Sequence, residues 1–565
     1  MASIIRKKRG KRSYYYYVES ARVNGKSRIV NQRYLGTAET ILEKISSNKI
    51  TPLYSKVLDF GDVALLFDIT VRLGVSDIIN KFIHKRNQGL SIGDYIVIAA
   101  INRAVSPTSK SGLQAWFDRT ILTQIMGIDT NLLTSQNYWN NLELNKSQID
   151  SIEECLVKKI VDTYDINTTH LIYDATNFFT YIDTKQDSEY AKRGHSKEKR
   201  NDLRVVGLSM IVSPDHSIPL FYDTYPGNRS DAKQFTEMLN KIRIRYQRIT
   251  NKTADITVVF DRGNNADYNI DLLEKDDFPM HYVGGLKSNQ CAELFLIPAT
   301  EYIELSDIEK SCAIRTHKEV YGRQMTIVVV YNQNLFDGQL QGVTANIEKT
   351  LKLLSELKLK LELRITNVVT KGKKPTVASV TKQVSQILAT EYMNDIFTYT
   401  ISTNDSGLPQ LEYNLDYAAF ETLKSTVLGK NVLFTNRHEW SNEEIVSAYR
   451  SAWHIEHAFR QMKDTSHLNV RPIFHWTDEK IEVHIFYCVL AYRLCCLLKK
   501  ELDESGIHES LNHILDDMHQ YKYVITVTGC NKNDVFTSLT QPSSLTSSIM
   551  QKYNLGKKYL SNICV

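Results

Sequence analysis

The chain has 565 residues, 42% hydrophobic and 24% charged, which is enough for three or four domains with ordinary soluble cores. Lys and Arg exceed Asp and Glu by 69 − 64 = 5, so the overall charge alone does not indicate a nucleic-acid partner. Eight cysteines without a CxxC pair argue against a zinc ribbon and a disulfide framework, and fit reduced thiols in a cytoplasm. No export signal or membrane span is expected, because the most apolar late stretch, residues 485–498, is short and contains Arg493.

Residues 1–56 are expected to form a small β unit with a basic arm. The arm precedes a run of four tyrosines, and the later segment RIVNQRYLG alternates like a strand before a glycine. The cations of the arm include Arg6, Lys7, Lys8 and Arg9. Cations beside tyrosines suit contact with DNA phosphates and bases, but a solvated charged tail has the same composition. Both interpretations stay open.

Residues 57–165 have the apolar spacing of helices, in stretches such as VALLFDITVRLGVSDIINKF and IGDYIVIAAINRAV. Ser106, Pro107 and Thr108 interrupt the pattern. We expect a DNA-binding domain of four or more helices here. A helix-turn-helix would fit, but no single spacing proves one.

Residues 166–290 change to the apolar period of strands. Three strand-like runs form an expected antiparallel meander, and helix, strand, helix and strand follow in that order. The ranges are 171–182, 204–214 and 217–227 for the meander, then 230–246, 256–263, 267–277 and 281–287. This order predicts an α/β fold with a ribonuclease H-like core, a mixed five-stranded sheet with helices. It would place Asp174 in the first strand beside Asp261 at the end of the fourth.

The rest of the chain is expected to complete this core around an insertion. Residues 291–435 read as a strand-rich insertion domain with a long helix around 347–363 and a lysine-rich turn, KGKKP. Residues 436–500 return to the core, ending in a buried helix from residue 481. Residues 501–565 read as an appendage with a Ser/Thr-rich loop at 537–548.

The stretch SNEEIVSAYRSAWHIEHAFRQMKD, residues 441–464, is expected to be one helix with two faces. Ser441 and Glu444 make a capping box at its start. One face centres on Glu456 and carries a phenol and two cations, Tyr449, Arg460 and Lys463, at helical spacings of −7, +4 and +7. The other face is apolar and carries Ala448, Ile455, Phe459 and Met462. A carboxylate framed by cations suggests a site near phosphates, although a lone Glu on a helix is usually solvated.

Three carboxylates, Asp174, Asp261 and Glu456, would thus meet from two strands and one helix. Hard cations take oxygen ligands and leave positions for water and a phosphate, so this trio suits two ions of Mg²⁺ or Mn²⁺. Each acid alone has a plainer interpretation. The Asp of FDRG, for example, is more often a turn former than a metal ligand.

Five blocks in order along the chain carry a resemblance to a known family. They are YDATN (173–177), GHSKEKRNDLRVVGL (194–208), GNRSD (227–231), VVFDRGNNAD (258–267) and YRSAWHIEHAFRQMK (449–463). Together they resemble the prokaryotic insertion-sequence DDE transposases of the insertion-sequence-four superfamily, over about residues 1–500. The resemblance implies that Asp174, Asp261 and Glu456 are the metal-binding catalytic triad. It also implies a cytoplasmic, nucleoid-associated protein.

The Tyr, Arg, Glu, Lys signature of that family matches at Tyr449, Glu456 and Lys463, with Arg460 as a further cation. It departs at residue 452, where Ala stands in place of Arg. Arg450 lies about a third of a turn off the Glu456 face of a regular helix, so it is no simple substitute. On that helix, Ala452→Arg would point at the phosphate and is expected to tighten DNA binding or raise cleavage.

Other DNA contacts are expected around this triad. Similar transposases stack a flipped base on an aromatic residue, for which Trp440 or Trp453 could serve, although burial in the core is as good an explanation. Arg262, beside Asp261, is a further expected DNA contact, as is Arg450. His454 and His457 lack the spacing of a zinc motif and are expected on the surface or in packing.

The GHSKEKR block has two open interpretations. His195, Lys197, Lys199 and Arg200 would contact the DNA backbone, or they would belong to an ordinary charged hairpin loop.

The sequence as a whole predicts a transposase that binds the terminal inverted repeats of its element, cuts the DNA and joins 3′-hydroxyls to a target. Its partner would be double-stranded DNA, bound by a homodimer. Two alternatives remain: a DNA-binding repressor of transposition without catalysis, which Ala452 keeps open, and a nuclease of the same fold without strand joining.

Overall fold

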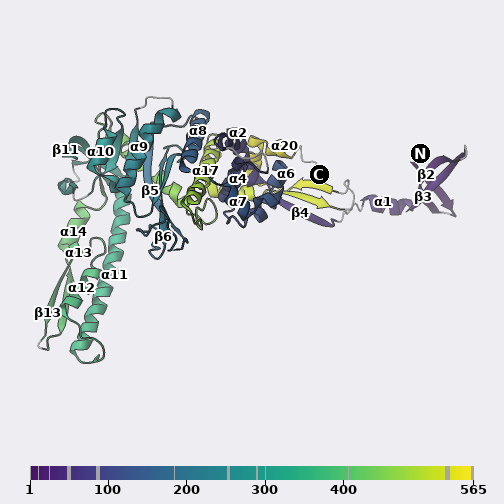
Figure 1. Ribbon diagram of the computed structural model, residues 1–565. Coiled ribbons are helices and arrows are strands. Elements are labelled where there is room, and N and C mark those ends of the chain that lie inside the picture. Colours follow the sequence, from purple (N-terminus) through teal and green to yellow (C-terminus); the bar gives the residue numbers. More distant parts are fainter. Residues whose placement is uncertain are drawn as a thin grey trace.

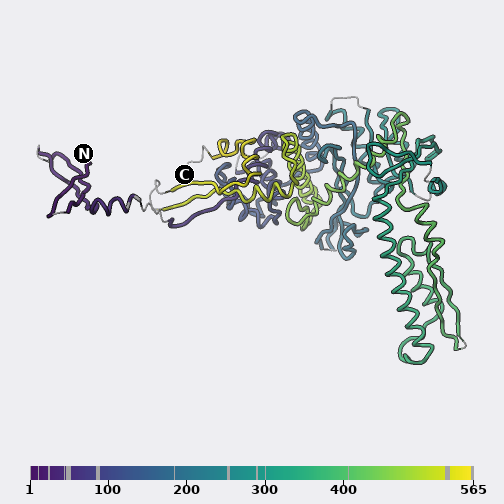
Figure 2. Tube along the Cα trace, turned by 180° about the vertical axis from the view of Figure 1, so that it is seen from behind, coloured from purple at the N-terminus to yellow at the C-terminus, as the bar shows by residue number. Residues whose placement is uncertain are grey.

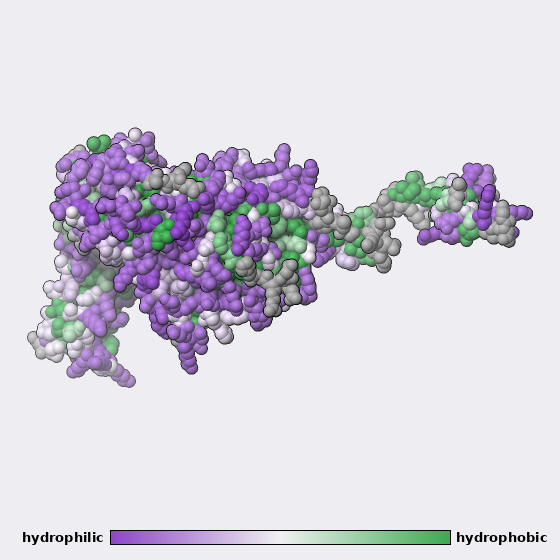
Figure 3. Space-filling view, turned by 45° about the horizontal axis from the view of Figure 1, so that its top comes forward, coloured by the Kyte–Doolittle hydropathy of each residue, from purple (hydrophilic) through white to green (hydrophobic). Residues whose placement is uncertain are grey.

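A computed structural model describes residues 2–10, 12–23, 26–46, 52–83, 89–183, 185–250, 255–287, 290–298, 301–404, 406–528 and 535–560. It shows a body with two projections, a small unit at the N-terminus and a long arm formed by the middle of the chain (Figure 1). The same arrangement is seen from behind in Figure 2. The visible face of the body in Figure 3 is predominantly hydrophilic.

The body contains a nine-stranded mixed sheet with the strand order β10-β11-β12-β15-β9-β8-β5-β6-β7. Its strands are β5 (His170–Thr180), β6 (Arg204–Val212), β7 (Pro219–Pro226), β8 (Thr257–Phe260), β9 (His281–Gly285), β10 (Ile303–Glu304), β11 (Ser311–Val320), β12 (Arg323–Asn332) and β15 (Lys430–Thr435). β5, β6 and β7 form the expected antiparallel meander, and β8 runs parallel to both β5 and β9. The predicted mixed sheet with flanking helices is therefore present.

The five predicted strands are only part of this sheet. β15 pairs antiparallel with β9, β12 with β15, and β11 with β12, so strands from residues 291–435 continue the sheet instead of standing apart from it. The extension is favoured because β9 would otherwise present an unpaired row of backbone donors and acceptors.

Helices cover the sheet and form the adjoining part of the body. α9 (Asp231–Thr250) packs on β6 and β7, α10 (Asp267–Leu273) packs on α9, and α17 (Asp478–Asp503) packs on β7 and on α4. The expected helical region contains α2 (Gly61–Leu73), α3 (Val75–Asn80), α4 (Ile92–Val105), α5 (Leu113–Phe117), α6 (Leu122–Met126), α7 (Ser135–Asn141) and α8 (Lys146–Tyr164). Short 3-10 turns occur at Thr130–Leu133, Arg262–Asn264 and Ala292–Leu296.

α17 is the central helix of the body. Within the described residues it is long and apolar enough to cross a membrane, but its whole apolar window is buried inside the fold. The helix carries one fully buried cation, Arg493, whose guanidinium donates to both carboxylate oxygens of Glu153 on α8 at 2.9 and 2.7 Å. Its Nε also donates to the carbonyl oxygen of Pro219 at 3.0 Å. This ion pair ties α17 to α8 and to the start of β7.

Two strands late in the chain pair with one strand from its early part. β4 (Tyr54–Asp59), β16 (Lys522–Val527) and β17 (Val535–Leu539) form one antiparallel sheet with β16 in the middle. α18 (Leu511–His519), α19 (Ser544–Tyr553) and α20 (Leu555–Tyr559) complete the region. The predicted Ser/Thr-rich loop at 537–548 is wrong in part, because β17 and α19 occupy its ends. Ser543 caps α19 by accepting a hydrogen bond from the backbone N–H of Thr546. Serine is common both at helix N-termini and in loops, so composition alone does not distinguish the two.

The arm has its own hydrophobic core. α11 (Gln333–Ile365) contains the predicted long helix, and α12 (Val377–Ile387), α13 (Met393–Ile396), β13 (Phe397–Thr403), β14 (Pro409–Leu415) and α14 (Tyr417–Thr426) pack along it (Figure 1). Its buried residues, among them Leu354, Val380 and Leu411, form a cluster separate from the main core.

The N-terminal unit is a three-stranded antiparallel sheet of β1 (Ala2–Arg9), β2 (Arg12–Val23) and β3 (Lys26–Gly36), followed by α1 (Ala38–Ser46). β3 confirms the strand predicted for RIVNQRYLG. Arg6, Lys7, Lys8 and Arg9 all lie on β1 and are exposed.

Candidate active site

The predicted single helix 441–464 is wrong, because the chain forms two helices. α15 (Asn442–Arg450) starts at the predicted capping box, in which Ser441 Oγ accepts from the Glu444 N–H at 3.1 Å. α16 (Trp453–Gln461) follows after a break at Ser451 and Ala452. There the Ala452 N–H bonds to the carbonyl of Tyr449, three residues back, and the Ser451 hydroxyl bonds to that of Ala448 at 2.5 Å. Serine hydroxyls that bond back to the helix backbone bend helices, which accounts for the break.

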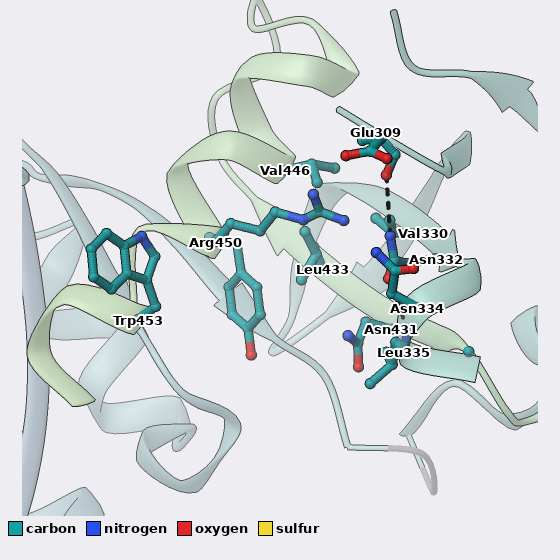
Figure 4. A pocket seen from close by; sticks show the side chains of 12 residues that line it. Glu309, Val330, Asn332, Asn334, Leu335, Asn431, Leu433, Val446, Arg450 and Trp453 are labelled. Atoms are coloured by element: carbon teal, nitrogen blue, oxygen red, sulfur yellow. Dashed lines mark hydrogen bonds between the residues drawn. The ribbon is translucent and has the colours of Figure 1, made fainter. Parts of the chain in front are cut away.

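The break changes where two residues point. Ala452 is partly buried against the main core, so the regular-helix argument for Ala452→Arg no longer holds. Arg450 extends from the end of α15 towards Glu309 and Asn332, while Trp453 begins α16 on the other side of the break (Figure 4). The Arg450 guanidinium donates to Ser311 Oγ at 2.8 Å. The apolar face is as predicted, since Ile455, Phe459 and Met462 are buried.

Asp174 lies within β5, and Asp261 directly follows the neighbouring parallel strand β8. β5 and β8 pair with Ile172 opposite Val259, and each Asp comes two residues later in the chain, Asp174 still inside β5 and Asp261 one residue past the end of β8. The register therefore brings the two carboxylates to adjacent positions, as the sequence predicts. α16, which carries Glu456, packs on β5 and β6 next to them.

Asp174 is an unusual carboxylate. Its pKa is raised to about 6, chiefly by burial. Lys197 and the Ala175 N–H oppose this rise, and the charges of Asp261 and Asp231 contribute to it. The Ala175 N–H donates to Asp174 Oδ1 at 2.7 Å. A carboxylate with this environment lacks a full counter-charge, which a divalent cation would supply.

Tyr449 links Asp261 to the helix pair. Its hydroxyl lies 3.4 Å from Asp261 Oδ1, and burial, followed by the charge of Asp261, raises the pKa of the phenol. The ring passes directly over Gly285, where an added Cβ would come within 2.7 Å of the hydroxyl. A glycine is therefore needed at 285 for Tyr449 to reach Asp261. Glu456 is close enough to contribute to the raised pKa of Tyr449.

Glu456 itself is exposed in this structure. Among the described residues, no three His, Cys, Asp or Glu side chains are gathered closely enough to hold a metal ion. Asp174 and Asp261 fit a hard divalent cation in position and in donor type. Glu456 stands on the adjoining helix without joining them.

Lys463 lies in a cluster that sequence reasoning found only in part. Its ammonium donates to Thr176 Oγ1 of β5 at 2.8 Å and lies 3.9 Å from a carboxylate oxygen of Glu198. Arg471 bonds to the other oxygen of Glu198 and to the backbone carbonyl of Lys463. Glu198 lies inside a block rich in cations, and Arg471 lies outside every block, so the sequence alone gives no signal for either residue.

The GHSKEKR block folds against β5 beside Asp174. Asn177 holds it there, since its side chain bonds to the His195 carbonyl at 2.8 Å and to the Lys197 N–H at 3.1 Å. The Lys197 ammonium bonds to the carbonyl of Ala175. Lys199 is exposed, and the Arg200 guanidinium pairs with Asp202 at 2.9 and 2.7 Å. Lys197 is thus the residue of this block that lies nearest the two acids.

Two glycines explain how the blocks fit together. An added Cβ on Gly194 would lie 2.1 Å from the carbonyl oxygen of Gly227, and one on Gly227 would lie 2.0 Å from that of Val205. The GHSKEKR and GNRSD blocks therefore pack backbone to backbone, which only glycine permits.

The two tryptophans differ in exposure. Trp440 is partly buried between the ring of His170, at 5.5 Å, and the guanidinium of Arg437, at 5.0 Å. Trp453 is 56% exposed and borders two cavities, of about 490 and 710 Å³. Arg450, Tyr449 and three asparagines line the smaller cavity, part of which is drawn in Figure 4.

The larger cavity contains the two histidines of α16. His454 Nδ1 lies 3.1 Å from Ser217 Oγ, and burial lowers the pKa of both His454 and His457. Arg460 lines the same cavity and is exposed. Arg262 is also exposed, beside Asp261.

Asp174→Asn is expected to stabilise the metal-free protein at pH 8. The raised pKa of Asp174 means that the folded state binds a proton more tightly than the unfolded state. Its contribution to stability is therefore full below pH 4 and is lost as pH rises through about 6. The variant should melt at a higher temperature than the parent in EDTA at pH 8, and the difference should vanish at pH 4. An equal or lower melting temperature at pH 8 would contradict this.

Comparison with known proteins matches residues 166–494, more than half of the chain, to the family described as transposase DDE domain. No curated protein matches the sequence. One similar solved structure is a piggyBac transposase synaptic complex with hairpin DNA, 10% identical, with a TM-score of 0.38 over 89% of this chain and 86% of that one. Another is a Mos1 mariner paired-end complex with Mn, 14% identical, with a TM-score of 0.15 over 35% and 60%. On the extent of the family match, the chain belongs to the transposase DDE domain family.

Proposed function

We propose that this transposase binds the terminal inverted repeats of its own insertion sequence, cuts the DNA there and joins the freed 3′-hydroxyls to a target. The observation that carries the proposal is the register of β5 and β8, which brings Asp174 and Asp261 to adjacent positions. Tyr449 reaches Asp261 from α15, and Glu456 on α16 and Lys463 just after α16 follow in the chain. We infer a ribonuclease H-like core from the order and directions of β7-β6-β5-β8-β9.

In this proposal each residue has a distinct task. Asp174, Asp261 and Glu456 would hold two ions of Mg²⁺ or Mn²⁺. When bound, these ions would activate the attacking oxygen and neutralise charge at the leaving oxygen. Tyr449 orients Asp261. Lys463, supported by Thr176, binds the phosphate next to the reacting bond. Because Glu456 is exposed although α16 packs on β5, we propose that DNA binding reorients the start of α16 so that Glu456 turns towards the two Asp residues, with the break at Ser451 and Ala452 as the bend.

The match to the Tyr, Arg, Glu, Lys group of the insertion-sequence-four superfamily is also a proposal. Tyr449, Glu456 and Lys463 support it. Ala452 stands where the signature has Arg. Arg450 supplies a cation near that position, but its side chain lines the cavity beside Trp453. We propose that this cavity and Trp453 receive a base flipped out of the element end, with Arg460 as a further phosphate contact.

DNA cleavage and strand-joining assays test the function directly. The substrate is the DNA that flanks the gene, with purified full-length protein and Mg²⁺ or Mn²⁺. Inverted repeats in both flanks, cut and then joined to a target plasmid, would support the transposase. Cleavage without joining would favour the nuclease, and binding without cleavage would favour the repressor. We expect two copies of the protein to act together, one on each end, in the cytoplasm of a prokaryote.

The N-terminal arm is expected to contribute phosphate contacts. On β1, Arg6 and Lys8 project from one side of the strand and Lys7 and Arg9 from the other. Lys7 is already engaged, because its ammonium lies 3.2 Å from the Gln32 side chain and 4.9 Å from the Tyr16 ring. Replacing Arg6 and Lys8 together with Ala should make the salt dependence of end binding shallower, by about 2 in the slope of log K against log salt. Lys7→Ala is the control, and an unchanged slope in the double variant would restore the solvated-tail interpretation.

A further inference from the structure

Three large aromatic side chains lie exposed together beside the proposed active site. Tyr181, Phe474 and Trp476 are 47%, 53% and 67% exposed. His475, between the last two, is buried, so exposed and buried side chains alternate along this segment. Clustered exposed apolar groups in a soluble protein mark binding surfaces. We name these three residues the aromatic platform.

The platform is held in place by backbone contacts. The Tyr181 ring stacks on Phe474, with centroids 5.1 Å apart and planes at 24°. The Thr180 hydroxyl and the Tyr181 N–H both donate to the carbonyl of Ile473, at 3.0 and 3.1 Å. The end of β5 and the segment before α17 are thereby fixed to each other. A pre-formed stack of this kind loses little conformational freedom when a ligand binds.

The platform is continuous with the active site through Phe179. The Phe179 ring meets Tyr181 edge-on at 5.7 Å, and the guanidinium carbons of Arg200 and Arg471 each lie 5.3 Å from it. Arg471 also donates to the backbone carbonyl of Lys463. A line of contacts therefore runs from the phosphate-binding Lys463 to the exposed rings.

Cations lie behind the platform. The Lys110 ammonium and His475 Nδ1 are buried, and neither has a hydrogen-bond partner among the described atoms. Burial, then the charges of Lys480 and Arg103, lower the pKa of Lys110 to about 8. Burial, then the charges of His484 and of Lys110, Arg103 and Lys480, lower the pKa of His475 well below its usual value, so His475 itself is neutral. Buried positive charge of this kind produces a positive potential at the nearby surface, which complements a polyanion.

We propose that the aromatic platform binds unpaired bases of a DNA strand that leaves the active site. The inference rests on the proposed function and extends it, since it assigns a single-stranded ligand to a second surface. Aromatic rings stack on any base, and cations attract the backbone, so such a surface takes single strands with little sequence preference. Tyr181 lies seven residues beyond Asp174, about 23 Å along an extended chain.

Fluorescence anisotropy with the full-length protein tests the proposal. The probes are a labelled 20-nucleotide single strand of mixed sequence and the matching duplex, both in EDTA so that no cleavage occurs. Trp476→Ala and Phe474→Ala should each weaken single-strand binding, by about 5- to 100-fold, and leave duplex binding within about 2-fold. Trp476→Phe should restore most of the affinity. Tyr417→Ala is the matched control, because Tyr417 is an aromatic residue of the arm that is 71% exposed.

Each other result would overturn the proposal. Equal losses for single strand and duplex would indicate a general phosphate surface. No loss for either would show that the platform does not bind DNA. A change in sedimentation of Trp476→Ala without a change in DNA binding would make the surface a contact between copies of the chain. None of these binding results depends on catalysis. A failure of the proposed function would show itself separately, as DNA cleavage by Asp174→Asn.

Discussion

Replacing Asp174 with Asn, Asp261 with Asn or Glu456 with Gln is expected to reduce DNA cleavage by on the order of 10³-fold or more. Each change removes one anionic oxygen ligand while it keeps the size of the side chain, so the loss falls on the chemical step. DNA binding should stay within a few-fold of the parent, since phosphate contacts lie on other residues. Cleavage is measured on end DNA with Mg²⁺ or Mn²⁺, and binding in EDTA.

The control for these three variants is Glu479→Gln, an exposed acid in the first turn of α17. It should cleave at the parental rate. If one of the three variants cleaves within about 2-fold of the parental rate, the residue that it replaces is not part of the catalytic site. If Glu456→Gln alone of the three variants stays active, Glu456 does not join the two Asp residues, and the site is built on Asp174 and Asp261 only.

The second large effect concerns stability. Glu153→Gln should lower the free energy of unfolding by about 3–5 kcal/mol, because it leaves the Arg493 guanidinium buried without a counter-charge. Arg493 is fully buried and bonds to both oxygens of Glu153. Chemical denaturation, followed by far-ultraviolet circular dichroism, gives the shift in midpoint.

The neighbouring residue supplies the control. Glu154 faces Arg248 at 3.5 Å, with side chains 25% and 61% exposed, so Glu154→Gln should cost less than about 1 kcal/mol. Replacing Glu153 and Arg493 together with Leu should recover much of the lost stability, since no buried charge remains. If Glu153→Gln were as mild as Glu154→Gln, solvent must reach the guanidinium.

The sequence predicted those parts of the fold that depend on local periodicity. The alternation of apolar residues in 171–227 predicted the meander of β5, β6 and β7, and the apolar run that ends in FDRG predicted β8. The order of these strands then predicted that Asp174 and Asp261 are adjacent. The extension of the sheet by β15, β12 and β11 could not be predicted in this way. Pairing between β9 and β15 joins residues about 150 apart, and no local pattern records which strand edge a distant strand will choose.

The candidate site shows the same division. The capping box and the apolar face of α15 and α16 could be predicted from the sequence, because both depend on residue spacings within two helical turns. The break at Ser451 could not be predicted from the sequence, because a serine at that position can also point to solvent without bending the helix. Asn177, Glu198 and Arg471 became visible only when tertiary contacts placed them beside Lys197 and Lys463.

The sheet of β4, β16 and β17 has a consequence for the timing of synthesis. Lys522 on β16 bonds to Asp59 on β4 at 2.7 Å, across 463 residues of chain. At 5–20 residues per second, a ribosome needs roughly 25 to 90 s to make the intervening segment. Throughout that interval β4 has no β16 beside it, and its edge is open to pairing with other chains. A chaperone that covers residues 54–59 during translation should therefore raise the yield of soluble protein, and messages cut short before residue 522 should give aggregates.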